Sequence, residues 1–217
     1  MVKNFRKSKL WNVFSWIFTI LAAFVVALLV NTYLIRTSNI NGSSMDDSYH
    51  EGQLVVLSKA PYLFGVPEYK DVVVFDSSCL DNPNYTRTFF DNIEDSIKYN
   101  VITQKVGEIF NLGIANDHRF WIKRVIGVPG DKIEFKDGKI YKNDILLEED
   151  YIREQNVLNN PEGVSFTVPE GKVLLCGDNR NRSMDCRSFV DGKALKCVPY
   201  EAILGKVLTE AQPQGGK

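Results

Sequence analysis

Three short stretches, far apart in the chain, carry residues that could form a serine nucleophile with a lysine base. The first is NGSSMDDSYHEGQ, residues 41–53, where two serines follow a glycine soon after an apolar segment. A serine hydroxyl is a weak nucleophile until a base takes its proton, and a neutral lysine amine can be that base. Since the ordinary pKa of lysine is about 10.4, such a lysine has to be desolvated within apolar surroundings.

Lys123 fits that description, because it is the single lysine in the apolar segment RFWIKRVIGV, residues 119–128. The alternative is a lysine on the outward face of a strand, which the alternation of side chains makes common. The third stretch, LLCGDNRNRSMDCRSF (residues 174–189), directly follows a predicted strand. Its charged and hydroxyl residues include Asp178, Arg180, Arg182, Ser183, Asp185 and Arg187. Taken alone, it is also compatible with a solvated turn whose ion pairs add little stability.

Histidine and cysteine form no metal-binding pattern in this sequence. The residues concerned are His50, His118, Cys79, Cys176, Cys186 and Cys197. None of them has the close pairing that a zinc site requires, so we expect no metal and no cofactor. His118 could act as the base for a serine, but a histidine on a surface loop is the favoured interpretation.

The segment between Cys186 and Cys197 suggests a returning ribbon, with Asp191-Gly192 at its turn. Such a ribbon could bring the two thiols together, and a disulfide could form outside the cytoplasm. Connectivity cannot be deduced from sequence, and free thiols are the slightly favoured alternative.

A membrane anchor is predicted near the N-terminus. Residues 11–30 hold no charged residue, and twenty helical residues span roughly 30 Å, the thickness of a hydrocarbon core. Four bases precede the segment, whereas Arg36 is the only base between it and residue 50. This bias predicts a cytoplasmic tail over residues 1–10, a single-pass transmembrane helix over residues 11–30, and an outer domain over residues 31–217. A cleavable signal sequence is less favoured, because the apolar run is long and lacks a small-residue cleavage site.

The rest of the chain predicts a mostly β fold, a small antiparallel β-barrel or sandwich. The predicted strand segments are residues 53–59, 71–77, 120–128, 132–135, 139–143 and 172–177. Asp137-Gly138 has the turn chemistry of a tight hairpin. Residues 79–116 form a partly helical insertion, with a helix predicted over residues 91–110 and capped by Asp91 or Asn92. A net charge of −1 gives no basic field for nucleic acid.

In this order, behind an apolar N-terminal segment, the three stretches resemble the bacterial type I signal peptidases, also called leader peptidases. The matching segments are GSSM (42–45), DVVVF (71–75), IKRVIGVPGDKI (122–133), GDNRNRSMDCR (177–187) and VPYEAILGKV (198–207). Chance agreement of several ordered segments is not credible. The resemblance covers most of residues 35–77 and 120–207.

The resemblance implies a role for each matched residue. Ser44 would be the nucleophile and Lys123 the general base, and the backbone N–H of Ser44 would help stabilise the oxyanion. Ser183 aligns with the hydroxyl that orients the lysine amine. The charged residues that align with the scaffold of the site are Asp178, Asp185, Arg124 and Arg187. Lysine rather than histidine at position 123 indicates the bacterial serine–lysine class.

The sequence departs from the family in the segment behind the nucleophile. Asp46-Asp47-Ser48 stands where the family has any residue, proline and threonine. The missing proline removes a fixed φ, although Ser48 keeps a hydroxyl. Gly42 lacks the hydroxyl that some relatives have there, and Cys186 replaces a usual serine.

The implied function is endoproteolytic removal of N-terminal signal peptides from exported preproteins that emerge from the secretion channel. The substrate would add to a strand edge as an extended strand. Membrane lipid is the other expected partner, with residues 60–67 either touching the bilayer or packed on the domain itself. The oligomeric state is not indicated. Two alternatives stay open: a specialised pilin-processing peptidase, and a catalytically silent assembly factor on the same fold.

Overall fold

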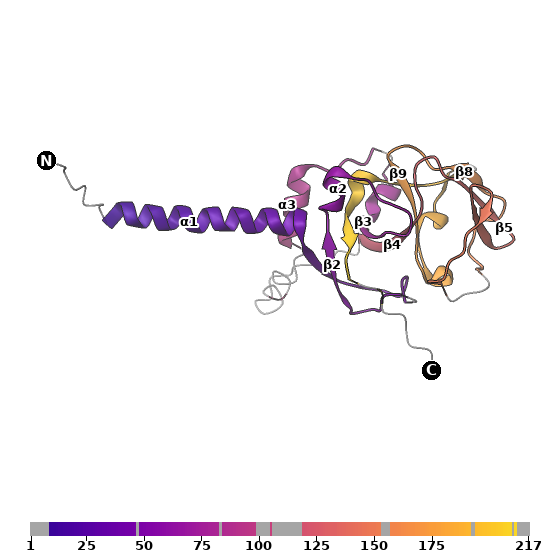
Figure 1. Ribbon diagram of the computed structural model, residues 1–217, viewed down its shortest axis with the longest axis horizontal. Coiled ribbons are helices and arrows are strands. Elements are labelled where there is room, and N and C mark those ends of the chain that lie inside the picture. Colours follow the sequence, from indigo (N-terminus) through magenta and orange to yellow (C-terminus); the bar gives the residue numbers. More distant parts are fainter. Residues whose placement is uncertain are drawn as a thin grey trace.

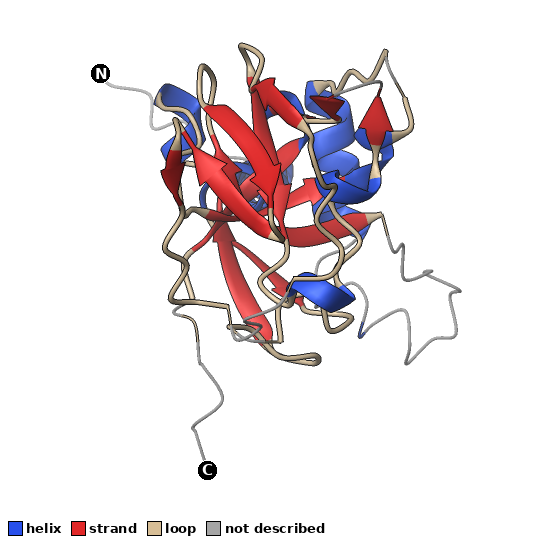
Figure 2. Cartoon of the chain, turned by 90° about the vertical axis from the view of Figure 1, so that its right-hand side faces the viewer, coloured by secondary structure: helices blue, strands red, loops and turns tan. Residues whose placement is uncertain are grey.

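The protein consists of a long N-terminal helix and a β-rich domain, as Figure 1 shows. The computed structural model describes residues 9–46, 48–82, 84–98, 105, 119–152, 157–191, 194–209 and 211. Every strand pairing in it is antiparallel. The predicted mostly β fold with an N-terminal apolar helix is therefore confirmed. Figure 2 shows the strands from the end of the domain opposite the long helix.

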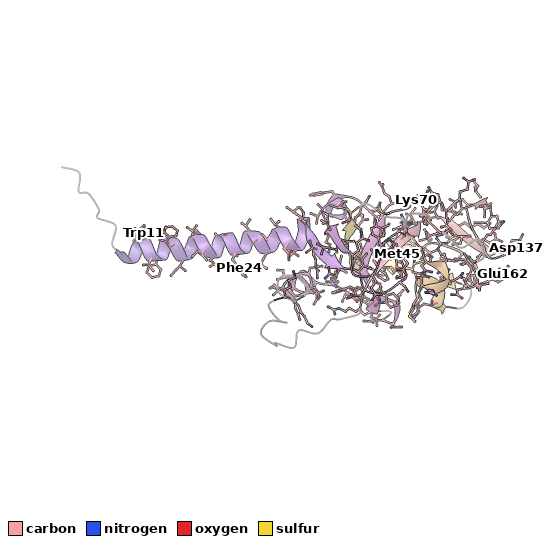
Figure 3. All side chains as sticks on the ribbon, turned by 90° about the horizontal axis from the view of Figure 1, so that it is seen from below. Trp11, Phe24, Met45, Lys70, Asp137 and Glu162 are labelled. Carbon is pink, nitrogen blue, oxygen red and sulfur yellow. The ribbon has the colours of Figure 1, made fainter. Side chains whose placement is uncertain are left out.

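The long helix is α1, Lys9–Leu29, and it runs into a π-helical turn, η1, Val30–Leu34. Its 21 residues rise about 31 Å, close to the thickness of a hydrocarbon core. The stretch Trp11–Thr32 is long and apolar enough to cross a membrane, and its most apolar part is not buried by the chain. Trp11 and Phe24 project from this helix in Figure 3. The helix is thus consistent with the predicted membrane anchor.

The larger sheet has seven strands in the order β1-β2-β13-β3-β4-β9-β12. They are β1 Arg36–Asn39, β2 Leu54–Ser58, β3 Val72–Asp76, β4 Phe120–Gly127, β9 Lys172–Cys176, β12 Val198–Pro199 and β13 Ile203–Val207. The strands predicted over residues 53–59, 71–77, 120–128 and 172–177 correspond to β2, β3, β4 and β9. The C-terminal strand β13 lies between β2 and β3, in the middle of the sheet.

The smaller sheet has four strands in the order β7-β6-β5-β8. They are β5 Lys132–Lys136, β6 Lys139–Lys142, β7 Ile145–Leu146 and β8 Ser165–Thr167. Asp137 (φ 53°) and Gly138 (φ 68°) connect β5 to β6 in the left-handed conformation of a tight hairpin turn, which confirms the predicted hairpin. Asp137 and Glu162 lie at the end of the domain away from α1 (Figure 3).

Short elements connect these strands. They are α2 Pro61–Phe64, η2 Ser77–Leu80, α3 Phe89–Lys98, η3 Arg180–Arg182, η4 Cys186–Ser188, β10 Val190–Asp191, β11 Ala194–Leu195 and η5 Tyr200–Ala202. β10 and β11 pair with each other, so the chain between Cys186 and Cys197 does return as a ribbon. The four cysteines are nevertheless free thiols in this structure.

The helix of the insertion begins earlier than predicted. α3 starts at Phe89, whereas the sequence placed the cap at Asp91 or Asn92, so that prediction is wrong. The reason is a capping box: the Asp91 carboxylate accepts from the Thr88 N–H at 2.7 Å, and the Thr88 hydroxyl accepts from the Asp91 N–H at 3.3 Å. Most of the predicted helix after Lys98 falls outside the described residues.

Two apolar cores cover opposite faces of the larger sheet. Along β3, Val73 and Phe75 belong to the main core, which also takes side chains from the smaller sheet. Val72 and Val74 belong to a second core beneath the 40–49 loop. This alternation follows from the two-residue period of a strand, and it buries β3 on both faces.

Candidate active site

The Lys123 amine lies against the Ser44 hydroxyl, with 2.7 Å between Nζ and Oγ. Lys123 is in β4 opposite Val73, and opposed residues project to the same face of a sheet, here the face of the main core. Only 3% of Lys123 is exposed. Its amine also donates to the Ile122 carbonyl at 2.9 Å and lies 5.4 Å from the ring centre of Trp121. The alternative of an outward-facing lysine is therefore wrong.

Burial lowers the pKa of Lys123 to about 8, because the charged ammonium loses its hydration in this position. The carboxylate of Asp185 opposes the effect, since a nearby negative charge favours the ammonium. The amine is therefore half neutral near pH 8 and mostly neutral above it. A neutral amine next to a hydroxyl is able to accept its proton.

The loop that carries Ser44 is held by its neighbours in the second core. Met45 is fully buried, and its carbonyl accepts from the N–H groups of Ser48 at 2.8 Å and Tyr49 at 2.7 Å. The Tyr49 hydroxyl donates to the carbonyl of Thr209 at 2.9 Å, which ties the loop to the end of β13. Because Met45 is buried and its carbonyl accepts two hydrogen bonds from the loop, the position of the adjacent Ser44 is fixed.

A buried ion pair lies behind the loop. The Arg124 guanidinium donates to both Asp178 oxygens, from Nε at 2.8 Å and from NH2 at 2.6 Å. The Ser48 hydroxyl donates to the same carboxylate at 2.6 Å. Ser48 therefore connects the loop of Ser44 to the Arg124–Asp178 pair. Asp47, beside it, lies outside the described residues.

Asn179 holds the backbone of Ser43 and Ser44, a contact that the sequence did not predict. Its backbone N–H donates to the Ser44 carbonyl at 3.1 Å, and its side-chain amide donates to the Ser43 carbonyl at 2.9 Å. Its place in the GDNR segment was visible in the sequence, but the residue type alone does not reveal which backbone it contacts. Among the described residues, no acceptor is bonded to the Ser44 N–H.

A second buried pair joins Asp185 to Arg187. The Asp185 carboxylate accepts from the Arg187 side chain at 2.9 and 2.8 Å, and from the Gly177 N–H at 2.9 Å. Burial by itself would raise the pKa of Asp185, but the bonds and charge of Arg187 outweigh it and the pKa is lowered. Asp185 therefore stays ionised beside Lys123.

Ser183 is buried close to these groups, but the bond expected from it is not formed. Its Oγ has no hydrogen-bond partner among the described residues, so it does not hold the Lys123 amine in this structure. It lies close enough to Asp185 to help lower the pKa of that carboxyl, although outside the geometry of a formed hydrogen bond. A Cβ placed on Gly177 would collide with it.

The cysteines considered from the sequence make no hydrogen bond to Lys123 or Ser44 among the described contacts. Burial raises the pKa of the Cys176 and Cys197 thiols to about 12, so both are inert thiols at neutral pH. His118 lies outside the described residues. Within the described part of the chain, no cluster of histidine, cysteine and carboxylate side chains could hold a metal ion.

Known proteins that are similar to this chain are described as signal peptidases. A family model described as signal peptidase, peptidase S26, matches residues 13–210. A signal peptidase I of Bacillus licheniformis is 28% identical over 195 residues, which cover 87% of this chain and 85% of the relative. A signal peptidase IB of Staphylococcus aureus strain COL is 28% identical over 211 residues, 90% of this chain and 87% of the relative.

Among solved structures, a crystal structure of a signal peptidase I from Enterococcus faecalis V583 is 25% identical, with a TM-score of 0.40. The match covers 66% of this chain and 97% of that one. The family model spans most of the chain from the apolar helix to the C-terminal strand. The chain belongs to the signal peptidase family, peptidase S26.

Proposed function

We propose that this signal peptidase removes signal peptides with Ser44 as nucleophile and Lys123 as general base. The observation that carries the proposal is the 2.7 Å contact between Nζ and Oγ, together with a lysine pKa of about 8. The neutral amine takes the Ser44 proton while Oγ attacks the carbonyl after the last residue of the signal peptide. The preprotein amine leaves with a proton from the lysine, and an ester to Ser44 forms.

Water then hydrolyses the ester, with the same lysine as base. In both steps the carbonyl oxygen becomes an oxyanion, and the Ser44 N–H is our proposed donor for it. A donor already aimed at the developing charge needs no reorganisation during the reaction. No cofactor or metal takes part in this scheme.

Other buried residues position the pair. In the proposal, Ser183 turns about its χ1 angle to place its hydroxyl against the Lys123 amine when substrate is bound. Arg124 with Asp178, and Arg187 with Asp185, act as scaffold. Each charge is paired and hydrogen-bonded, because a lone charge in this interior would be costly.

The topology is part of the proposal. Residues 1–10 lie in the cytoplasm, residues 11–30 cross the membrane, and residues 31–217 form the outer domain with its insertion at 79–116. Preproteins that emerge from the secretion channel are then presented beside the anchor, and tethering raises their effective concentration at the site. The exposed apolar side chains of Phe64 and Val66 support a contact of residues 60–67 with lipid.

The test is cleavage of a model preprotein by purified full-length protein in detergent micelles. Ser44→Ala and Lys123→Ala are expected to lose at least about a thousandfold in rate, as expected for loss of a nucleophile or its base. Ser43→Ala is the matched control and is expected to cleave like the wild type, because only the backbone carbonyl of Ser43 is used. Cleavage at wild-type rate by either of the first two variants would refute the roles. The silent assembly factor would be favoured if the wild type cleaved no preprotein or pilin.

A further inference from the structure

The helix of the insertion, α3, lies where the membrane anchor meets the domain. It contacts both the end of α1 and the π-helical turn η1, and Figure 1 shows it beside the domain end of α1. Thr32 in η1 is buried, although the anchor before it is exposed. α3 therefore packs against the domain end of the anchor.

A network of ion pairs centred on Asp95 fixes α3 in that position. Asp95 is 3% exposed, and its carboxylate is paired with Arg87 and, at 2.5 Å, with Arg119. Its backbone carbonyl accepts from Arg36, the first residue of β1, at 2.9 Å. Through Asp95, α3 is thus bonded both to Arg36, which follows the anchor, and to Arg119, which directly precedes β4.

The network extends into the catalytic sheet. Asp76 at the end of β3 pairs with Arg87 at 3.2 Å and with Arg119 at 3.8 Å. The guanidinium groups of Arg36, Arg87 and Arg119 lie 4.8 to 6.0 Å from the ring centre of Phe120. Phe120 opens β4, the strand that carries Lys123 three residues later.

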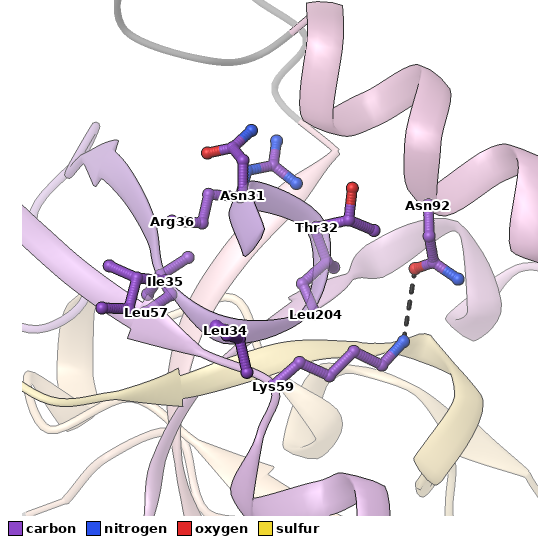
Figure 4. Close-up of a pocket in the computed structure, with 9 residues that line it drawn as sticks. All are labelled: Asn31, Thr32, Leu34, Ile35, Arg36, Leu57, Lys59, Asn92 and Leu204. Carbon is purple, nitrogen blue, oxygen red and sulfur yellow. Dashed lines mark hydrogen bonds between the residues drawn. The ribbon is translucent and has the colours of Figure 1, made fainter. Parts of the chain in front are cut away.

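Little free space remains at this junction. The pocket between η1, β2, α3 and β13 has a volume of about 10 Å³, room for about one water molecule. Figure 4 shows Lys59 crossing it to reach Asn92 of α3, with 3.3 Å from Nζ to Oδ1. The anchor is thus packed onto the domain rather than joined by a loose linker.

From this packing we infer that α3 and its arginine network fix the height of Ser44 above the membrane. The network thereby selects which peptide bond of a bound preprotein is cut, by its distance from the apolar segment. Ser44 lies eight positions after Arg36, so its site lies at most about 29 Å from Arg36, the first residue of β1. An extended preprotein segment beside β1 needs at most about eight residues to cover that distance. The inference rests on the proposed function and adds a determinant of specificity.

The experiment uses full-length protein in lipid nanodiscs and a series of model preproteins. The spacing between the apolar segment and the cleaved bond is lengthened from four to twelve residues, in steps of about two. A soluble peptide with the same cleavage sequence and no apolar segment reports the chemistry alone. The variants are Asp95→Asn and Arg119→Gln, with Arg119→Lys as the conservative variant. Lys132→Gln is the control, since it breaks an exposed ion pair with Asp144 in the smaller sheet.

The wild type and the Lys132→Gln control are expected to show a sharp optimum of spacing. Asp95→Asn and Arg119→Gln should flatten it, lowering the ratio of best to worst spacing by about fivefold, while peptide cleavage stays within about twofold. Arg119→Lys should restore the optimum in large part.

Two results would overturn the inference while the proposed function stands. One is a spacing profile that is the same in both variants as in the wild type. The other is an equal loss on peptide and preprotein, which would mean that the network only keeps the domain folded. A wild type that cleaves neither substrate would instead contradict the proposed function, and the inference with it.

Discussion

Lys123 and Ser44 are 79 positions apart in the sequence, yet their side chains are in hydrogen-bond contact. β4 brings Lys123 to the edge of the main core, and buried Met45 and Tyr49 hold the loop of Ser44 over the second core. The contact thus depends on both faces of one sheet. The desolvation that lowers the lysine pKa and the alignment of the nucleophile come from the same packing.

The activity should depend on pH through the Lys123 amine. In the proposed mechanism its neutral form is the active one, and its pKa is lowered to about 8, first of all by burial. We expect kcat/KM to rise about tenfold per pH unit below pH 8 and to level off above it. Steady-state cleavage of the soluble peptide between pH 5 and 10 measures this. A flat profile across that range would argue against a lysine base.

Removing the lysine should stabilise the protein while it abolishes cleavage. A pKa lowered from 10.5 to about 8 means that protonating the folded protein costs more than protonating the unfolded chain. The penalty is absent above pH 10.5, grows as the pH falls, and is complete below about pH 8, where it reaches about 3 kcal/mol. Lys123→Met should therefore raise the free energy of unfolding at pH 7 by up to that amount, less the lost hydrogen bonds.

Denaturant unfolding of the variant and the wild type at pH 7 and at pH 10.5 measures this gain. The difference between the two proteins is expected to shrink at the higher pH. A variant that is less stable than the wild type at both values would show that Lys123 is not held at an electrostatic cost.

The Ser48 hydroxyl should matter for positioning Ser44. The hydroxyl is buried and donates to the Asp178 carboxylate at 2.6 Å. Ser48→Ala therefore removes one hydrogen bond from a buried carboxylate. We expect a loss of about 1–2 kcal/mol in stability and a fall of about tenfold in kcat. Ser48→Thr keeps the hydroxyl and should stay within about twofold. Equal activity of the alanine and threonine variants would dismiss this role.

Gly177 should tolerate no side chain. An added Cβ would lie 2.5 Å from the Ser44 carbonyl oxygen and would also overlap Ser183 Oγ. Gly177→Ala should displace the nucleophile and reduce cleavage by about a hundredfold. Gly163→Ala is the control: its φ of +74° adds backbone strain, but nothing lies within 4 Å of its Cβ position, so stability alone should fall slightly. Comparable activities of the two variants would show that the tight contact at Gly177 is unimportant.

Much of the fold could be predicted from local patterns. The short apolar runs that became β2, β3, β4 and β9 are a local property of the sequence, and so is the Asp137-Gly138 turn. The order of the strands could not be predicted, since β13 enters between β2 and β3 from the far end of the sequence. Any apolar strand has the sequence pattern expected between β2 and β3, and only tertiary packing determines which strand lies there.

The site could be predicted in part, through the resemblance of its segments to a known family. Ser44 and Lys123 are in contact as predicted, whereas the burial of Lys123 could not be derived from alternation alone. Asn179 was missed because it acts through backbone carbonyls, which leave no mark in the sequence. The network around Asp95 was missed because charged residues scattered over 36–119 read individually as solvated surface.

Titration of the Lys123 amine shows directly whether burial keeps this amine neutral near pH 8. The lysines of the full-length Ser44→Ala protein in micelles are labelled with ¹³C at Cε. The signal of Lys123 is the one that disappears when the Lys123→Met substitution is added. We expect this signal to titrate with a midpoint near pH 8. A midpoint near 10.5, the value of an ordinary solvated lysine, would contradict it.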